Sequence, residues 1–265
     1  MFLIALVACS PVDTEAATSF EDWSSEVEEE ALADGCPSEL FRQYDAHPSN
    51  DFVDAPYVGV TCTSDELVVQ ANGVPHYEYV DMTPNGLQAK DHEWSVTLDP
   101  ALTGDQEDVP LLGVIAFTLT GLPIYGPNEG AFPDPYGDPV YNAIVDDCLG
   151  HTAQQGEYHD HALVTACVVE EWSSGPSPII AYALDGFAVY GPTGCLDAEC
   201  SEVVEYSSGW EQTGDPETYA WDNYAFRSSE DPTILDRCNG HTGPDGDYHY
   251  HATEGFPYVL GCYSG

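Results

Sequence analysis

The sequence predicts an all-β or β-dominated fold on three observations. Short runs with an alternating apolar and polar pattern recur along most of the chain, as in half-buried strands. The 24 Gly and 20 Pro residues that separate these runs are typical of turns. No long stretch has the 3.6-residue periodicity of an amphipathic helix. At 265 residues with 43% hydrophobic content, the chain can bury a substantial core as one or two domains.

The chain begins with an apolar run, residues 1–8, followed by a cysteine. The tetrapeptide that ends at Cys9 looks like a bacterial lipobox, which predicts a signal peptide over residues 1–9 and lipid on the Cys9 thiol. The run is short and lacks a preceding Lys or Arg, which a misassigned start codon would explain; the alternative is a frayed apolar end. Residues 10–34 are rich in Ser, Thr, Ala and Glu and predict an acidic tether, so the domain covers 35–265.

Strand-like runs fill this domain. They include residues 66–71, 94–98, 112–119 and 179–184. Residues 117–127 match residues 182–192 at an offset of 65, and each segment predicts a strand, a glycine turn, a short strand and a Gly-Pro exit. A longer insertion, residues 195–237, follows the second copy. Its Trp210 and Trp221 could form a lid over a site, although surface loops are the commoner explanation.

A second duplicated segment carries six of the nine histidines. Residues 148–161 and 238–251 match at an offset of 90, with Cys, Gly-His-Thr, Gly, Tyr-His and the last His in common. Together the duplications predict two pseudo-equivalent β repeats, approximately 111–167 and 179–262, related by an approximate two-fold axis in one disulfide-braced domain.

Each histidine segment predicts a β-hairpin. Pro244, Asp245 and Gly246 suit a three-residue loop, which would place His241 opposite His249. His251 would lie beside His249, because residues i and i+2 of a strand share a face. A four-residue loop would instead place His241 opposite a tyrosine and dissolve the cluster. The first copy predicts the same geometry around residues 154–156. Its cluster consists of His151, His159 and His161.

Three neutral imidazoles on a rigid hairpin suit Zn or Cu and leave one coordination position open. The neighbouring residues could support these ligands by hydrogen bonds or simply pack. They are Tyr158, Asp160, Tyr248 and Tyr250. The alternative is that the histidines hydrogen-bond one another in a polar core, and the duplication of all three favours the metal. His76, after a Val-Pro turn, is a possible additional ligand.

The charge is extreme, with 47 acidic residues against 4 basic ones and a formal net charge of −43. Nucleic acid is excluded as a partner, because phosphate binding needs a cationic surface. Salt or divalent cations would screen the repulsion, which suggests a saline habitat or bound Ca²⁺. The candidate Ca²⁺ ligands lie before the first histidine segment. They are Asp134, Asp138, Asp146 and Asp147.

Nine cysteines are many for a reducing compartment, and without Cys9 the remaining eight make four pairs. The duplication predicts that two disulfides brace the histidine hairpins, while two more link local partners. The pairs are Cys148–Cys167, Cys238–Cys262, Cys195–Cys200 and Cys36–Cys62. Thiolate metal ligation is less favoured, because no CxxC pair is present.

At Tyr248-His-Tyr-His251 the chain resembles the YHYH domain family. The resemblance includes several other segments and covers roughly residues 60–265. These segments are 72–76, 121–127, 185–192 and 256–262. It implies an extracytoplasmic β-rich domain and does not specify a reaction. The first copy departs from the pattern, since it reads Tyr-His-Asp-His, so the two sites could differ.

The sequence contains no GxGxxG, P-loop, HExxH or GxSxG motif, which disfavours nucleotide chemistry and serine hydrolysis. We expect a lipoprotein of the cell envelope or exterior that contacts the membrane only through its lipid. Its histidines would bind Cu, the favoured metal, or Zn, for redox or hydrolytic chemistry. The alternative is a non-catalytic module that sequesters metal or binds a glycan, a small molecule or a partner. The sequence indicates no particular catalytic residue.

Overall fold

The computed structural model describes residues 35–130 and 135–265. The predicted signal peptide, Cys9, the tether and Asp134 lie outside these ranges. Strands dominate the described part, and its single α-helix is the short α1 (Thr165–Val168). The 3-10 turns are η1 (Ser38–Leu40), η2 (Pro48–Asn50), η3 (Gln154–Gly156) and η4 (Ala220–Asn223). The prediction of a β-dominated fold is confirmed.

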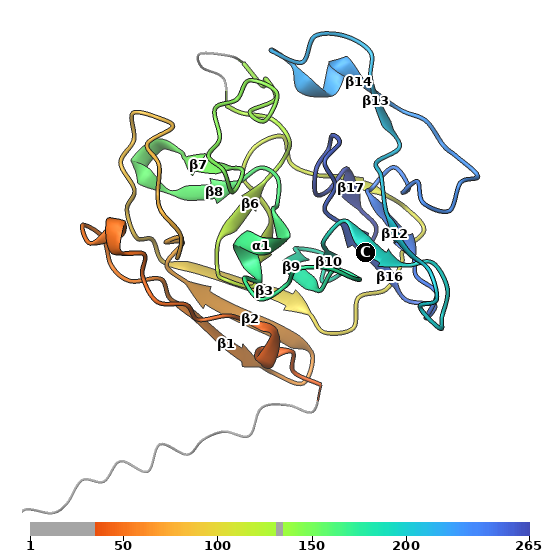
Figure 1. Ribbon diagram of the computed structural model, residues 1–265, viewed down its shortest axis with the longest axis horizontal. Helices are drawn as coiled ribbons and strands as arrows, with labels where there is room; N and C mark the ends of the chain where they lie inside the picture. The colour runs from red at the N-terminus through yellow and green to blue at the C-terminus, as the bar shows by residue number, and fades with distance from the viewer. Residues whose placement is uncertain (1–34, 131–134) are drawn as a thin grey trace, which may run out of the picture. The chain divides into compact units, whose positions relative to one another are not determined.

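The largest element is an eight-stranded sheet with the strand order β15-β16-β10-β9-β5-β6-β8-β7 (Figure 1). In that order the strands are Gly240–Thr242, Tyr248–His251, Ala188–Tyr190, Ile179–Ala183, Val114–Thr118, Pro123–Tyr125, Tyr158–Asp160 and Gly150–Thr152. The pairings on both sides of the central β5–β9 pair have the same senses. β5–β6 and β9–β10 are antiparallel, β6–β8 and β10–β16 are parallel, and both outer pairs are antiparallel. The two histidine hairpins therefore form the two edges of this sheet.

A three-stranded antiparallel sheet precedes it, built from β1 (Val58–Cys62), β2 (Glu66–Ala71) and β3 (His92–Thr97). Alternation along these strands buries one face, as expected for a sheet with one solvent-exposed side. On that face the Trp94 ring stacks on Phe117 of β5, with 5.0 Å between ring centroids. This contact joins the two sheets.

Two small antiparallel pairs lie within residues 193–226, at the start of the insertion and inside it, and a third pair joins the C-terminal strand to an early one. The pairs are β11 (Thr193–Cys195) with β12 (Val203–Glu205), β13 (Trp210–Gln212) with β14 (Tyr224–Phe226), and β4 (Glu107–Asp108) with β17 (Cys262–Tyr263). Trp210 and Trp221 both pack on the buried Phe256, at centroid distances of 5.8 and 4.8 Å. These two tryptophans therefore cover the core, which gives them a packing role in place of the lid considered above.

Four disulfides brace the domain, and they join the four pairs that the cysteine positions predict. They are Cys36–Cys62, Cys148–Cys167, Cys195–Cys200 and Cys238–Cys262. Such a density of disulfides indicates an oxidising, extracytoplasmic location. Within residues 35–130 and 135–265, no helix has the length and apolar character needed to cross a membrane.

Candidate metal centres

Both histidine hairpins have the three-residue loop that the sequence predicts. In the second hairpin the Gly243 amide donates to the Asp247 carbonyl, and His241 pairs with His249 across the strands. In the first hairpin His151 pairs with His159 in the same way. The register therefore brings three imidazoles together on one face of each hairpin.

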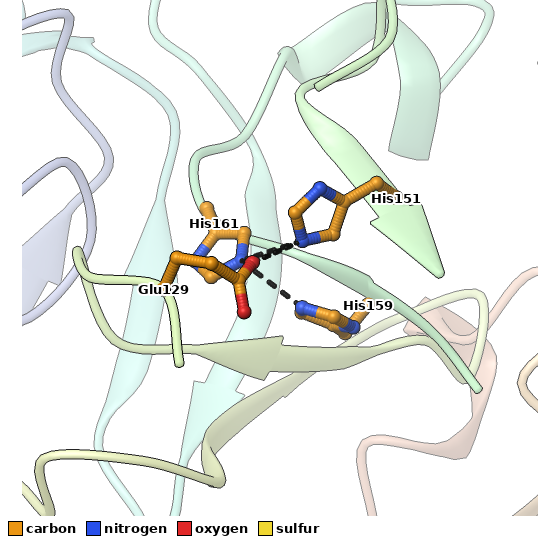
Figure 2. Close-up of side chains that lie close together, drawn as sticks. All are labelled: Glu129, His151, His159 and His161. Atoms are coloured by element: carbon orange, nitrogen blue, oxygen red, sulfur yellow. Dashed lines mark hydrogen bonds and ion pairs between the residues drawn. The ribbon is translucent and has the colours of Figure 1, made fainter. Parts of the chain in front are cut away.

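Metal site 1 consists of the three imidazoles of the first hairpin and a carboxylate, and Figure 2 shows the four side chains converging. Its members are Glu129, His151, His159 and His161. The Nε2 atom of His161 lies 3.0 Å from that of His159 and 3.2 Å from that of His151. The Oε2 atom of Glu129 lies 2.7 Å from the Nε2 of His151 and 3.6 Å from that of His161. The imidazoles are 1–2% exposed, so this site is buried.

Metal site 2 consists of His241, His249 and His251. The Nε2 atom of His241 lies 3.2 Å from the Nε2 atoms of both other rings. His251 is buried, whereas His241 and His249 are partly exposed. Ligand nitrogens about 2.0–2.1 Å from a tetrahedral ion would be about 3.3 Å apart, so both clusters have the size that Zn or Cu needs.

Backbone carbonyls hold five of the six rings by their Nδ1 atoms. The partners are Ile144 for His151 (2.7 Å), Glu157 for His159 (3.4 Å), Gly126 for His161 (2.7 Å), Asp247 for His249 (3.2 Å) and Gly191 for His251 (2.6 Å). A carbonyl can only accept a hydrogen bond, so each of these Nδ1 atoms carries a proton, and in the neutral form of the ring Nε2 is then the unprotonated nitrogen. The Nε2 lone pair of such a ring then faces the centre of its cluster, as a metal ligand requires.

The duplicated Tyr-Gly-Pro segments supply part of this support. Parallel pairing of β6 with β8 places Gly126 beside His161, and pairing of β10 with β16 places Gly191 beside His251. The preceding tyrosines contact another histidine of each site. Tyr125 stacks on His159 at a centroid distance of 4.0 Å, and Tyr190 lies 4.7 Å from His249. The segments that repeat at offsets of 65 and 90 therefore meet at each site.

An aspartate two residues before each hairpin cysteine fixes the start of the hairpin. Asp236 accepts hydrogen bonds from the amides of Cys238 and Gly240 and from the Tyr248 hydroxyl, at 2.8, 3.0 and 2.8 Å. In the first copy Asp146 accepts the corresponding three bonds, from Cys148, Gly150 and Tyr158. Each carboxylate thereby ties the Gly-His strand to the tyrosine on the facing strand.

Burial favours the neutral form of four of the six imidazoles, those of His159, His241, His249 and His251, and metal ligation needs that form. Burial lowers the pKa of His241 to about 4 and that of His251 to about 3. Burial also lowers the pKa of His159 well below its usual value. Burial raises the pKa of the Glu129 carboxyl, but hydrogen bonds donated by the Nε2 atoms of His151 and His161 outweigh burial and hold that pKa well below its usual range. An Nε2 atom donates such a bond only when it carries a proton, in the place that a metal ion would take.

Other residues proposed from the sequence lie elsewhere. The hydroxyls of Tyr158 and Tyr248 bond to the aspartates just described, and that of Tyr250 donates to Asp185 at 2.6 Å. Asp160 is buried on the same strand face as Tyr158, opposite the imidazoles. Strand alternation thus directs all four away from the two sites, and their support is confined to the other face of each hairpin.

His76 is a member of neither cluster in the described part of the chain. Its ring stacks on Tyr44 at a centroid distance of 4.2 Å, and its Nε2 lies 3.5 Å from an oxygen of Glu170. Burial lowers the pKa of His76 to about 4. Because Glu170 is largely exposed and screened by water, burial outweighs the attraction and the ring is neutral at pH 7.

Two of the proposed Ca²⁺ ligands accept hydrogen bonds from other groups of the protein. Asp146 has the role described above, and the buried Asp138 accepts bonds from the hydroxyls of Tyr224 and Tyr258 at 3.2 and 2.6 Å. Neither belongs to a cluster of potential ligands among the described residues. Asp146 thus organises the first hairpin, whereas Asp138 ties its own segment to β14 and to the C-terminal residues.

The sequence interpretation missed several residues of the sites. Extending the offset of 90 by two residues would have found Asp146 and Asp236. Tyr125 and Tyr190 lay within the repeat at offset 65, but nothing in the sequence linked that repeat to the histidines. The sequence contains no indication of Glu129, because the repeat at offset 65 places a glycine, Gly194, at the equivalent position of the second copy.

The fold and its sites define a class: a β-dominated, disulfide-braced domain with two histidine clusters that could hold a metal ion. The YHYH protein family model matches residues 93–265, and the chain belongs to that family. Neither the search of curated proteins nor the search of solved structures found a match.

Proposed function

We propose that this protein binds two transition-metal ions, Cu or Zn, one at each histidine site. One observation carries the proposal: Nε2 atoms converge to 3.0–3.2 Å in both clusters while backbone carbonyls hold most of the opposite ring nitrogens. Lone pairs that face one another at this distance repel unless a cation lies between them. A metal ion bound by three imidazoles satisfies all of them at once.

Protons offer the competing explanation. In metal site 1, His151 would have to become a buried imidazolium paired with Glu129, and His159 would have to exchange its long bond to Glu157 for one to His161. In metal site 2, a single proton on the Nε2 of His241 would have to serve two acceptors. The first rearrangement places a charge on a buried imidazole, and the second leaves one N–H group to serve two acceptors. A bound metal ion therefore explains the close Nε2 atoms better than protons do.

We further propose that the two sheet halves on either side of β5–β9 are the pseudo-equivalent repeats expected from the sequence. Their matching strand senses support this. The disulfides support action outside the cytoplasm, and a lipid on Cys9 would hold the protein at the membrane. The chemistry would be redox with Cu or hydrolytic with Zn, and simple sequestration of metal is the alternative.

The test is the metal content of protein purified without a His tag, stripped with a chelator and reloaded. The wild type should hold two ions per chain, one for each cluster. His249→Ala and His159→Ala should each hold one, and the double variant none. His47→Ala, which removes an imidazole outside both clusters, is the matched control and should hold two. Unchanged stoichiometry in both single variants would favour the hydrogen-bonded core instead.

A further inference from the structure

The two metal sites differ in one residue. It lies three positions after the glycine whose carbonyl holds a histidine ring, Gly126 at metal site 1 and Gly191 at metal site 2. After Gly126 this residue is Glu129, whose carboxylate completes metal site 1. After Gly191 it is Gly194, which has no side chain to reach the metal. A Cβ at Gly194 would lie 2.8 Å from the Tyr206 ring and 3.4 Å from the Cε1 of His251. The second site therefore lacks a fourth protein ligand at this position, and Tyr206 leaves no room for one.

The space beside Gly194 is a cavity of about 300 Å³. All three imidazoles of metal site 2 line it, together with Tyr190 and Tyr206. A cavity of this volume is at the lower end of the range for small-molecule sites. The fourth coordination position of a metal bound here would thus face an open, partly aromatic cavity.

His241 also differs from its counterpart in the first site. The Nδ1 of His151 bonds to a carbonyl, whereas the Nδ1 of His241 makes no hydrogen bond to any residue in the part of the chain that the structure describes. In addition, His241 and Tyr206 line a second hollow of about 1100 Å³. The ring of His241 is therefore the one of the six that no backbone carbonyl holds among the described residues, and it borders both hollows.

The charge of the 300 Å³ cavity selects among ligands. Asp197 and Asp245 line it, and no Lys or Arg is among its described lining residues. Asp197 and Asp245 offset the two positive charges of a bound Cu²⁺ or Zn²⁺, and no cationic side chain among these described lining residues attracts an anion. The net charge of −43 also repels carboxylates, phosphates and other anions from the protein as a whole. A ligand with an uncharged nitrogen or oxygen donor meets no such barrier, and the tyrosine rings offer it a surface to pack on.

We propose that metal site 2 binds an exogenous small molecule through an uncharged nitrogen or oxygen donor, whereas metal site 1 is closed. This inference rests on the proposed metal binding and assigns the two ions different roles. The ion of metal site 1, held by three imidazoles and Glu129, stabilises the fold. The ion of metal site 2 is the one that a substrate or ligand reaches.

The test is a titration of Cu²⁺-loaded protein with imidazole, a neutral donor, and with acetate, an anion, at pH 8. Electron paramagnetic resonance follows the copper in His159→Ala, which keeps metal site 2, and in His249→Ala, which keeps metal site 1. Imidazole should shift the spectrum of His159→Ala at a concentration about tenfold or more below that needed for His249→Ala, because only one site has an open position. Acetate should shift neither. Copper measured after desalting shows that the shift is not removal of the metal.

Two further measurements test the same inference without relying on the folding of a single variant. In the wild type, imidazole should change one of the two copper signals, which does not depend on the folding of a variant. Glu129→Ala should make metal site 1 responsive, while Glu129→Gln, whose amide oxygen can still ligate, should change it less. Equal responses of the two sites, or copper at both sites with no response, would overturn the inference. Failure of either site to bind copper would instead reject the proposed function itself.

Discussion

Replacing Asp236 by Ala should destabilise the domain and disorganise the second histidine hairpin. The carboxylate accepts hydrogen bonds from two amides, Cys238 and Gly240, and from the Tyr248 hydroxyl. Both amides belong to buried residues, although the carboxylate borders the hollow of about 1100 Å³, so water can replace only part of the lost acceptor. An unsatisfied buried donor costs about 1–3 kcal/mol. We therefore expect Asp236→Ala to lower the free energy of unfolding by about 3–4 kcal/mol, allowing for some relaxation.

The conservative variant separates hydrogen bonding from packing. In Asp236→Asn the amide oxygen can still accept from the two backbone N–H groups, and the Tyr248 hydroxyl can turn to accept from the new NH₂ group. The cost should fall to about 1 kcal/mol. The same pair of substitutions at Asp146 should give the same pattern in the first hairpin, because its carboxylate accepts the corresponding three bonds.

The assay is urea unfolding of the disulfide-intact protein in the presence of chelator, so that metal binding does not contribute to the measured stability. Asp231→Ala is the matched control, since that exposed carboxylate also accepts backbone and hydroxyl bonds but its donors can turn to water. A loss of about 3–4 kcal/mol corresponds to a fall in melting temperature of roughly 6–16 °C for a domain of this size. If Asp236→Ala costs no more than Asp231→Ala, the aspartate does not brace the hairpin.

Two other perturbations test the electrostatics of the domain. Burial lowers the pKa of His76 to about 4, against about 6.5 in the unfolded chain, so its contribution to stability is complete above pH 6.5 and is lost as the pH falls towards 4. Between pH 7 and pH 5, His76→Phe should therefore lose about 1–2 kcal/mol less stability than the wild type in urea unfolding, and identical pH profiles would contradict this. The melting temperature of the wild type should rise with NaCl, because the Debye length falls from about 10 Å at 0.1 M to about 3 Å at 1 M and screens the charge of −43. A flat response in calorimetry would mean that the charges are well separated or neutralised by bound divalent ions.

The parts of the sites that the sequence predicts are those governed by local geometry. The register of each hairpin depends on a three-residue loop, and the convergence of its histidines follows from strand alternation, so both could be expected from 14 consecutive residues. The disulfides could be expected because the cysteines recur with the hairpins. These predictions needed no knowledge of how distant strands pair.

The remaining parts depend on contacts between distant segments. The carbonyl of Gly126 is 35 residues from His161, and that of Gly191 is 60 residues from His251. Only the parallel pairing of β6 with β8 and of β10 with β16 brings them together. Tyr206 reaches metal site 2 from the longer insertion, residues 195–237, that precedes the second histidine segment. Periodicity and turn chemistry carry no information about such pairings, so the support of the sites could not be predicted.

The sheet topology also determines how metal ions bound at the two candidate sites would work. The histidine strands β8 and β16 are separated by four other strands in the sheet order, and Figure 1 shows them well apart. Five strand spacings of about 4.8 Å place them about 24 Å from each other along the sheet. Two-metal catalysis needs ions about 3.5–4 Å apart, so under the proposed function each site would act as a mononuclear centre. At such a separation single-site substitutions should add without coupling. Under the proposal, the difference between Glu129 and Gly194 would therefore adapt one site for ligand exchange without loss of the other.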